Sequence, residues 1–246
     1  VYIDSDADYA DLFDRGEALR QTLSPLAFEA QTQLLNSQGV VRKNALVQFK
    51  ADTTATAVDF GYGARALQAV HRANGQRLQV APIEQIAPFA RQTATTAPKA
   101  AYQIAELSID QHHLENAFLR VEVANNGEIT SIFDKRARRE LLRKGSVGNQ
   151  LKVYQDKPLN WDAWDIDWFY EEKSWSIDTA AKIEVIETGP HRAALRIERA
   201  YNQSRLVQII SLQVDARQVE FDFYADWQES QSLLKAEFDF DVVSDQ

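Results

Sequence analysis

Short runs in which apolar and polar residues alternate dominate the second half of the chain. The last four of them recur at a spacing of roughly 10 to 12 residues, as in antiparallel β domains. Successive side chains of a strand point to opposite faces, so each run can bury one face and expose the other. The runs cover residues 118–123, 129–133, 183–186, 193–199, 206–214 and 219–224. This pattern predicts an antiparallel sandwich rather than parallel strands joined by helices.

The turn between the first two runs carries a strong hairpin signal. Asn125-Asn126-Gly127 stands between the alternating residues. Asn and Gly tolerate positive φ, which both central residues of a type I′ turn require. The sequence therefore predicts a tight hairpin with a type I′ turn.

The first hundred residues give weaker signals. Apolar residues recur at near-helical spacing over residues 4–23, and Pro25 ends the pattern. After that, residues 45–49 and 76–83 have the composition of short strands, and Ala-rich residues 64–73 suggest a short helix. The stretch 91–99, rich in Thr and Ala, suggests a linker or a surface loop.

These signals predict a mainly β protein. We expect an antiparallel β-sandwich, preceded by a short helical segment and a small β region. The expected divisions are a helical segment at 1–35, a small β-rich region with a linker at 36–100, and a large β-sandwich domain at 101–246.

Composition excludes several classes of function. A formal net charge of −9 argues against nucleic-acid binding, because neutralising phosphates requires a basic surface. The chain has no cysteine, so it offers neither disulfides nor a thiolate nucleophile. No apolar run reaches the roughly 18 residues of a membrane span. We therefore expect neither nucleic-acid nor membrane partners, and a cytoplasmic location.

Residues 161–170 form an unusual stretch, rich in tryptophan and aspartate, and four of the five tryptophans lie between Trp161 and Trp175. Aromatic faces and carboxylates are the groups that bind sugars, through C–H stacking and hydroxyl hydrogen bonds. The alternative is a domain interface with buried aromatics and turn-capping aspartates, which composition alone favours. The candidate residues at a substrate rim or domain interface are Trp161, Asp162, Trp164, Asp165, Asp167 and Trp168.

If the stretch is extended, Trp164, Ile166 and Trp168 share one face and the aspartates the other. Carboxylates two residues apart could then meet the short spacing of a retaining glycosidase pair, but any strand with alternate aspartates meets it too. A calcium site is a weaker alternative, because the EF-hand spacing is absent. None of the four histidines has a zinc-binding spacing, so we expect no catalytic residue and no metal site in this chain.

Several ordered motifs resemble glycoside hydrolase family 38, the α-mannosidases, in the region that follows the catalytic domain. The match is dense over about residues 110–243. The motifs that carry it are Leu114-Glu115-Asn116, Phe118-Leu119-Arg120-Val121, Ser131-Ile132-Phe133-Asp134-Lys135, Gly148-Asn149-Gln150-Leu151, Asp156-Lys157-Pro158-Leu159-Asn160, Asp162-Ala163-Trp164-Asp165-Ile166-Asp167 and Leu233-Leu234-Lys235-Ala236.

The resemblance implies a galactose-mutarotase-like super-sandwich from a zinc-dependent retaining exo-mannosidase. It places zinc, or another divalent metal, and the nucleophilic aspartate in an N-terminal catalytic domain. This chain would then be a non-catalytic fragment, inactive alone, in which residues 1–35 end a helical bundle and the large β domain is truncated at its C-terminal end. Its partners would be that catalytic domain and a mannose-containing glycan. A carbohydrate-binding module and a purely structural or homo-oligomerisation domain remain as alternatives.

Overall fold

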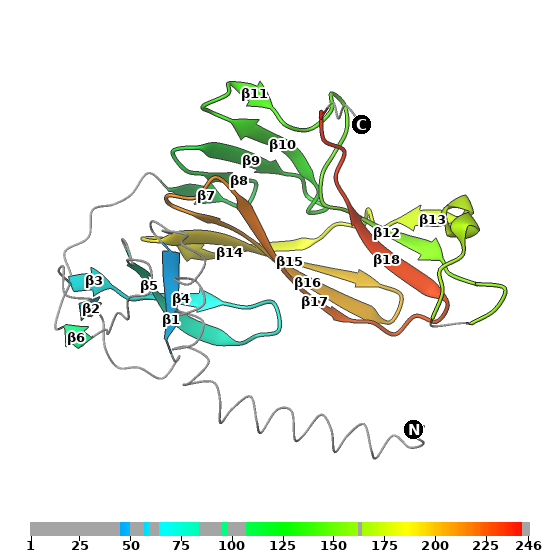
Figure 1. Ribbon diagram of the computed structural model, residues 1–246, viewed down its shortest axis with the longest axis horizontal. Coiled ribbons are helices and arrows are strands. Elements are labelled where there is room, and N and C mark those ends of the chain that lie inside the picture. Colours follow the sequence, from blue (N-terminus) through cyan, green and yellow to red (C-terminus); the bar gives the residue numbers. More distant parts are fainter. Residues whose placement is uncertain are drawn as a thin grey trace, which may run out of the picture.

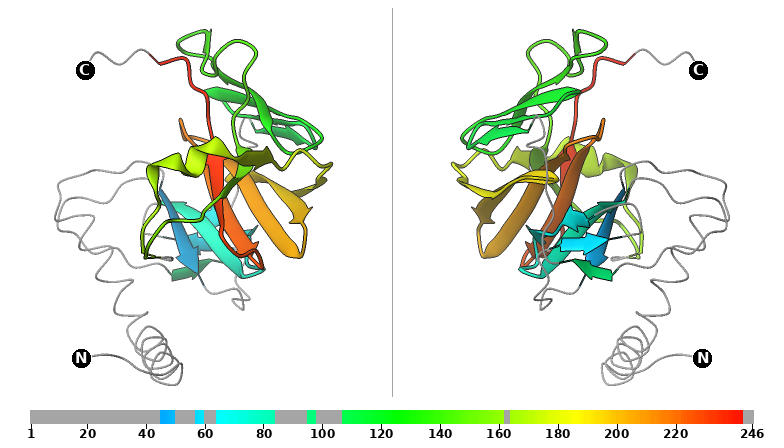
Figure 2. Two further views of the ribbon diagram at one scale, coloured as in Figure 1. Left: turned by 90° about the vertical axis from the view of Figure 1, so that its right-hand side faces the viewer. Right: turned by 90° about the vertical axis from the view of Figure 1, so that its left-hand side faces the viewer.

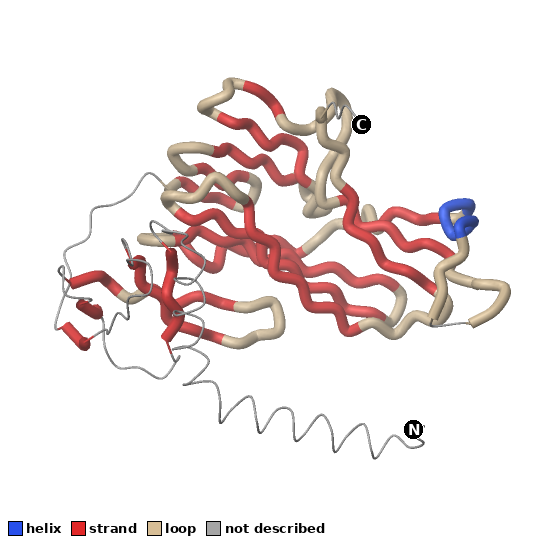
Figure 3. Tube along the Cα trace, in the orientation of Figure 1, coloured by secondary structure: helices blue, strands red, loops and turns tan. Residues whose placement is uncertain are grey.

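The structure is a computed structural model that describes residues 45–49, 57–59, 64–83, 95–97, 107–161 and 164–242. These residues form antiparallel strands and a five-residue 3-10 helix, η1 (Trp168–Glu172), as Figures 1 and 3 show. The prediction of a mainly antiparallel β fold is confirmed. The helix predicted within residues 1–35 lies outside the described residues. Among the residues described, none belongs to a helix long and apolar enough to cross a membrane.

A four-stranded antiparallel sheet forms the middle of the molecule. Its strands are β14 (Lys182–Thr188), β15 (Arg192–Tyr201), β16 (Ser204–Gln213) and β17 (Val219–Asp226), in that order. They correspond to the last four alternating runs, so those predictions are confirmed. Strand β16 is buried on both faces over most of its length, which means that other elements cover both sides of this sheet.

A five-stranded sheet covers one face of the central sheet. Its strands are β7 (Ser108–Asp110), β8 (His113–Glu115), β9 (Leu119–Val123), β10 (Ile129–Asp134) and β11 (Arg139–Glu140), in the order β11-β10-β9-β8-β7. Leu114, Val121 and Ile129 from this sheet pack in one buried cluster with Leu195 and Ile210 of the central sheet. The alternating residues therefore form the core of a sandwich.

A three-stranded sheet lies on the same face of the central sheet as the five-stranded sheet. Its strands are β12 (Gln150–Gln155), β13 (Ser174–Ser176) and β18 (Ser232–Glu237), in the order β13-β12-β18. Leu151 and Val153 of β12 pack on Leu206 of β16. Leu206 is four residues before Ile210, so both project from one face of β16. The central sheet thus supports two smaller sheets side by side.

Buried polar groups join the five-stranded sheet to the β13-β12-β18 sheet. The Arg199 Nε donates to the Asn126 carbonyl at 2.7 Å, and its guanidinium also donates to Gln208. The Gln208 amide donates to Asn149 Oδ1 at 2.8 Å, and Asn149 donates to the Gly127 carbonyl at 3.1 Å. Burial lowers the pKa of Arg199 to about 10. The network fixes the start of β12 against the β9–β10 hairpin.

Two small sheets come from the first hundred residues. One contains β1 (Ala45–Phe49), β5 (Arg77–Ile83) and β4 (Gln68–His71), and the other contains β3 (Ala64–Ala66), β2 (Ala57–Asp59) and β6 (Thr95–Ala97). Ala73, in the β4–β5 turn, packs against Ala194, Val207 and Ile209 on the other face of the central sheet. The β1-β5-β4 sheet therefore forms a third layer, which Figures 1 and 2 show beside the central strands.

Three local predictions are wrong. Residues 64–73 form β3 and β4 rather than a helix, because pairing with β2 and β5 outweighs the helical preference of alanine. Within 91–99, Thr95–Ala97 pairs with β2 instead of forming a loop. In the predicted type I′ turn only Gly127 has positive φ, and its N–H donates to the Ala124 carbonyl. The turn is therefore type I followed by a left-handed glycine.

Candidate functional site

The tryptophan-rich stretch leaves the end of β12 as an exposed loop. We call residues 159–172 the aromatic loop; they connect β12 to β13 and include η1, at the right-hand end of the molecule in Figure 1. Trp161, Trp164 and Trp168 are 77%, 91% and 83% exposed. Leu159 and Ile166 are exposed beside them in the sequence. Five large apolar side chains of one loop are therefore accessible to solvent or to a partner.

Short-range hydrogen bonds shape this loop. The Trp164 N–H donates to the Trp161 carbonyl at 2.8 Å and closes a turn. The Leu159 N–H donates to Asp167 Oδ2 at 2.7 Å, which ties the two ends of the loop together. The Tyr170 N–H donates to the Asp167 carbonyl at 3.0 Å at the start of η1. The backbone is therefore held while the indoles remain exposed.

The base of the loop rests on β12 and β18 through an aromatic clamp, which we define as Tyr154, Tyr170 and Lys235. The two tyrosine rings meet edge to face, with centroids 5.4 Å apart. The Lys235 Nζ lies 4.9 Å from each ring centroid and donates to the Tyr170 hydroxyl at 2.8 Å. A cation held over aromatic faces stabilises this arrangement electrostatically. The clamp anchors η1 to the sheet.

Next to the clamp, Lys152 of β12 and Glu237 of β18 form an ion pair. Burial acts to raise the pKa of Glu237, but hydrogen bonds from Lys152 and Tyr154 lower it overall. Lys152 Nζ lies 2.7 Å from Glu237 Oε2. The hydrogen bond to Glu237, together with burial, raises the pKa of Tyr154 to about 12. Glu237 is therefore an acceptor held in place by its neighbours, and Tyr154 stays protonated.

The structure places the predicted site residues as follows. Trp161, Trp164, Asp165 and Trp168 are exposed, Asp167 is half-buried, and Asp162 lies outside the described residues. The interpretation of an extended segment with one aromatic face is wrong, because the turn at Trp164 and η1 interrupt it. Asp167 accepts a backbone hydrogen bond, which is the turn-capping role of the interface alternative.

The described residues offer no metal centre. No three His, Asp or Glu side chains among them come together in a way that could hold an ion. Asp165 and Asp167 therefore do not form part of a calcium or zinc site within this part of the chain. The resemblance places the zinc centre in a catalytic domain, and the described residues supply no set of ligands for one.

Sequence reasoning missed the clamp. Tyr154 and Lys235 lie far apart in the sequence and meet because β12 pairs with β18, with Tyr154 opposite Leu233. Lys235, a single charge in the otherwise apolar Leu233–Ala236 run, was the available signal. Its partner rings could not be chosen without the register of these strands.

The comparisons with known proteins decide the family. The model described as "Glycosyl hydrolases family 38 C-terminal domain" matches residues 114–246, which is more than half of the chain. The chain belongs to glycoside hydrolase family 38. The matched residues contain the central sheet, the aromatic loop and the clamp. The resemblance found in the sequence motifs is therefore confirmed.

Curated relatives agree with this family. "Alpha-mannosidase 2C1" of Homo sapiens is 34% identical over 135 residues, covering 54% of this chain and 13% of that protein. "Alpha-mannosidase G" of Dictyostelium discoideum is 32% identical over 130 residues, covering 50% of this chain and 12% of that protein. The chain thus matches only about an eighth of the length of these relatives.

Solved structures agree at the level of the fold. The crystal structure of an alpha-mannosidase from Enterococcus faecalis V583 superposes with a TM-score of 0.52 and 14% identity, covering 79% of this chain and 26% of that one. A second family 38 protein from Enterococcus faecalis gives a TM-score of 0.53 and 13% identity, covering 89% of this chain and 29% of that one. The family 38 chain therefore has the β architecture of these larger proteins.

Proposed function

We propose that this chain is a non-catalytic part of a zinc-dependent retaining α-mannosidase that hydrolyses terminal α-mannosides of oligosaccharides. The names of its curated relatives support the activity of the parent protein. In this proposal the zinc and the nucleophilic aspartate belong to a catalytic domain outside the matched region. The described residues bring no metal-binding group together, and none of them is assigned a catalytic step.

In the proposal the aromatic loop lies where the β domain meets the catalytic domain, at the rim of the sugar site. The observation that carries this is the exposure of Trp161, Trp164 and Trp168 on a loop whose base is fixed. Exposed indoles on a fixed backbone lose little conformational freedom when they contact a partner. Indole faces can also stack on the C–H faces of a pyranose, so one loop can serve both contacts.

The activity assignment is tested on the chain and on the full-length protein that contains it. Hydrolysis of p-nitrophenyl α-mannoside is measured with added zinc or cobalt. We expect turnover by the full-length protein and none by the 246-residue chain. Sustained turnover by the chain alone would overturn the non-catalytic assignment.

The role of the loop needs a separate comparison in the full-length protein. We expect Trp164→Ala to lower kcat/KM for an α-mannoside by about tenfold, as loss of one stacking contact at a rim would. Trp227→Phe is the control, because Trp227 is not part of the loop and is stacked on Tyr201, with ring centroids 5.9 Å apart. Equal kinetics for wild type and Trp164→Ala would remove the loop from the sugar site.

The exposed tryptophans also favour a second candidate, a carbohydrate-binding module that acts without the catalytic domain. It predicts that mannose oligomers change the tryptophan fluorescence of the 246-residue chain and that Trp164→Ala abolishes the change. A flat titration would count against this candidate. Sedimentation of the chain beside the full-length protein addresses a homo-oligomerisation role, which would show as concentration-dependent association. The cytoplasmic location remains a prediction.

A further inference from the structure

Strand β17 forms one edge of the central sheet. In the order β14-β15-β16-β17 it has one hydrogen-bonded neighbour, β16, among the described strands. Its eight residues pair with β16 in a continuous register, so no bulge interrupts the strand. A long, unpaired edge is a template for a further strand, and proteins usually cover or interrupt such edges.

The ladder determines which backbone groups of β17 point outward. The Val214 N–H donates to the His191 carbonyl and so continues the β15–β16 pairing. Bonded pairs alternate along an antiparallel ladder, so even-numbered residues of β16 bond β15 and odd-numbered ones bond β17. The β17 partners of these odd-numbered residues are even-numbered. The odd-numbered residues of β17, from Val219 to Ala225, therefore point their N–H and C=O groups away from β16, where no described residue bonds them.

The same odd-numbered residues carry an apolar face. Phe221 lies opposite Ile210, whose side chain belongs to the sandwich core. Phe221 and Phe223 are nevertheless 38% and 42% exposed. Phe221 meets Phe238 edge to face, with ring centroids 5.3 Å apart, and Phe238 stacks on the exposed Phe240. A strand added to the edge would lay its own apolar side chains beside these rings.

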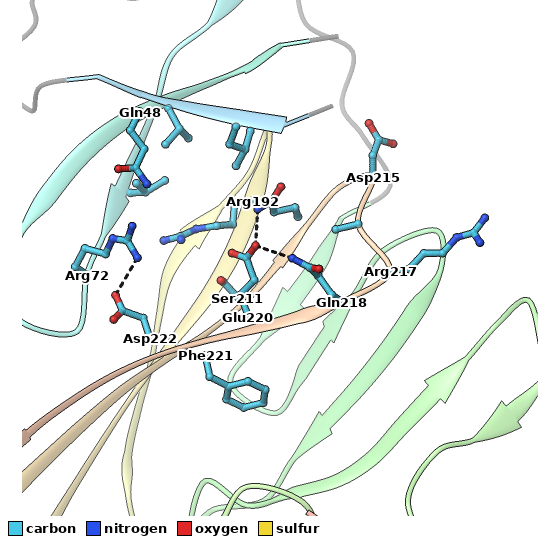
Figure 4. Close-up of a pocket in the computed structure, with 15 residues that line it drawn as sticks. Gln48, Arg72, Arg192, Ser211, Asp215, Arg217, Gln218, Glu220, Phe221 and Asp222 are labelled. Carbon is cyan, nitrogen blue, oxygen red and sulfur yellow. Dashed lines mark hydrogen bonds and ion pairs between the residues drawn. The ribbon is translucent and has the colours of Figure 1, made fainter. Parts of the chain in front are cut away.

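The other face of β17 is acidic. Figure 4 shows Glu220 and Asp222 on the opposite side of the strand from Phe221, where they line a cleft of about 760 Å³ between the β1-β5-β4 sheet and the central sheet. Arg72 lies 3.6 Å from Asp222. Glu220 and Asp226 accept hydrogen bonds from glutamine amides and form no ion pair with any described residue. An added strand therefore meets carboxylates on this face.

A second copy of β17 does not suit this edge. When two copies of a strand pair about a two-fold axis in one continuous sheet, even-numbered residues meet even-numbered residues, because opposite side chains share a face. The registers that pair most of the strand then place Asp222 opposite itself, Glu220 opposite Asp222 or Asp226, or Asp222 opposite Asp226. Like charges directly opposite are destabilising. The pattern of β17 instead suits a strand with basic residues at these positions.

We propose that the outer edge of β17 receives an extended segment of a partner protein as an added strand of the central sheet. The segment alternates apolar residues, which lie beside Phe221 and Phe223, with lysine or arginine residues, which face Glu220 and Asp226. Backbone hydrogen bonds supply affinity, and the alternating side chains supply specificity. This surface goes beyond the proposed function, because it involves neither the aromatic loop nor a catalytic domain.

The test uses the 246-residue chain and a fluorescein-labelled peptide of about nine residues that alternates lysine and valine, long enough to span the strand. Binding is measured by fluorescence anisotropy. We expect one peptide to bind per chain and the affinity to fall as salt is added. A peptide with glutamate in place of lysine should not bind. A peptide with the same lysines and valines in two separate blocks should bind at least about tenfold more weakly, because it cannot match both faces.

Two variants of the chain examine the edge itself. Phe223→Pro removes an outward N–H and spares the bonds to β16, so it should abolish peptide binding. Asp226→Asn removes a charge from the acidic face and keeps an acceptor oxygen, and it should weaken binding about threefold. Glu184→Gln is the matched control, because it removes a charge from β14 at the other edge of the same sheet. It should leave the affinity unchanged.

Circular dichroism verifies the fold of each variant. If Phe223→Pro unfolds the chain, the Asp226→Asn and Glu184→Gln pair still decides. Absence of binding by the alternating basic peptide would overturn the proposal, as would equal binding of the block peptide. Equal losses in Asp226→Asn and Glu184→Gln would reduce the effect to net charge and overturn it too. Sedimentation of the chain without peptide examines the second copy, and self-association that Phe223→Pro abolishes would assign the edge to that copy instead.

Discussion

Arg192 and Glu187 form a two-point ion pair at the joint between the small β1-β5-β4 sheet and the central sheet. Arg192 Nε and Nη2 each lie 2.7 Å from a different oxygen of Glu187. Glu187 also accepts the His71 backbone N–H at 2.7 Å, and Arg192 donates to the His71 carbonyl at 3.2 Å. The side chains are buried. The pair thus fastens β4 to β14 and β15, and the cleft lies beside it.

Removing one member of this pair should be costly. Glu187→Ala leaves a buried guanidinium without its carboxylate, and we expect the free energy of unfolding to fall by about 3–5 kcal/mol. Urea denaturation of the 246-residue chain measures the loss. Glu184→Ala on the same strand is the control, because its carboxylate is solvent-accessible and its ion pairs with Lys182 and Arg196 are each worth under about 1 kcal/mol. Equal losses in the two variants would contradict the assigned role.

Gly127 should not tolerate a methyl group. It has φ +78°, and an added Cβ would lie 2.6 Å from Ile197 Cγ2 and in closer contact with Arg199. We expect Gly127→Ala to destabilise the chain by about 2–4 kcal/mol, from left-handed strain and overpacking together. Gly75→Ala has φ +89° but nothing within 4 Å, so it isolates the strain. Thermal denaturation should show a clearly larger loss at Gly127.

The aromatic loop should contribute little to stability. Trp164 is exposed, so Trp164→Ala should change the free energy of unfolding by no more than about 0.5 kcal/mol. Tyr170→Ala should cost more, because it removes the ring that contacts Tyr154 and Lys235. Chemical denaturation of both variants distinguishes the exposed side chains from the clamp. A large loss at Trp164 would mean that the indole packs within the chain.

The stability of the chain should depend on Glu198 in acid. The hydrogen bond from Arg205, with that from Arg196, outweighs burial and lowers the pKa of Glu198 to about 2. A carboxylate with a lowered pKa stabilises the fold above its ordinary pKa of about 4.3, and this stability is lost as the pH falls towards the folded-state value.

The Glu198→Gln variant tests this dependence. It should be less stable than wild type near neutral pH, and the difference should shrink between about pH 4 and pH 2. Urea midpoints of both proteins across that range provide the measurement. A difference that stays constant with pH would show that Glu198 acts through packing rather than through its charge.

The strands of the second half could be read from the sequence because the alternating pattern is local. Residues 195–198 and 219–223 alternate apolar and polar side chains in the sequence itself, whatever their partners, although the structure buries both faces of β16. Where this periodicity was absent the prediction failed. The Ala-rich residues 64–73 have no strong period, so only pairing with β2 and β5 decided that they are strands.

The candidate site, too, was only partly predictable from the sequence. The sequence marked the tryptophans and aspartates by their density, but it gave no sign that the segment turns at Trp164. The clamp formed by Tyr154, Tyr170 and Lys235 depends on the pairing of β12 with β18, which are about 80 residues apart in the chain. The cleft beside Glu220 depends on the packing of two sheets from different parts of the chain.

The sequence by itself therefore determined the fold class, the family and the location of the exposed aromatic loop. These follow from side-chain periodicity and from motifs that are contiguous in the chain. Tertiary structure alone decided which rings hold Lys235, which carboxylate holds Arg192 and which walls enclose the cleft. Such contacts arise from strand register and layer packing, and these are set by the burial of many side chains together rather than by any local run of residues.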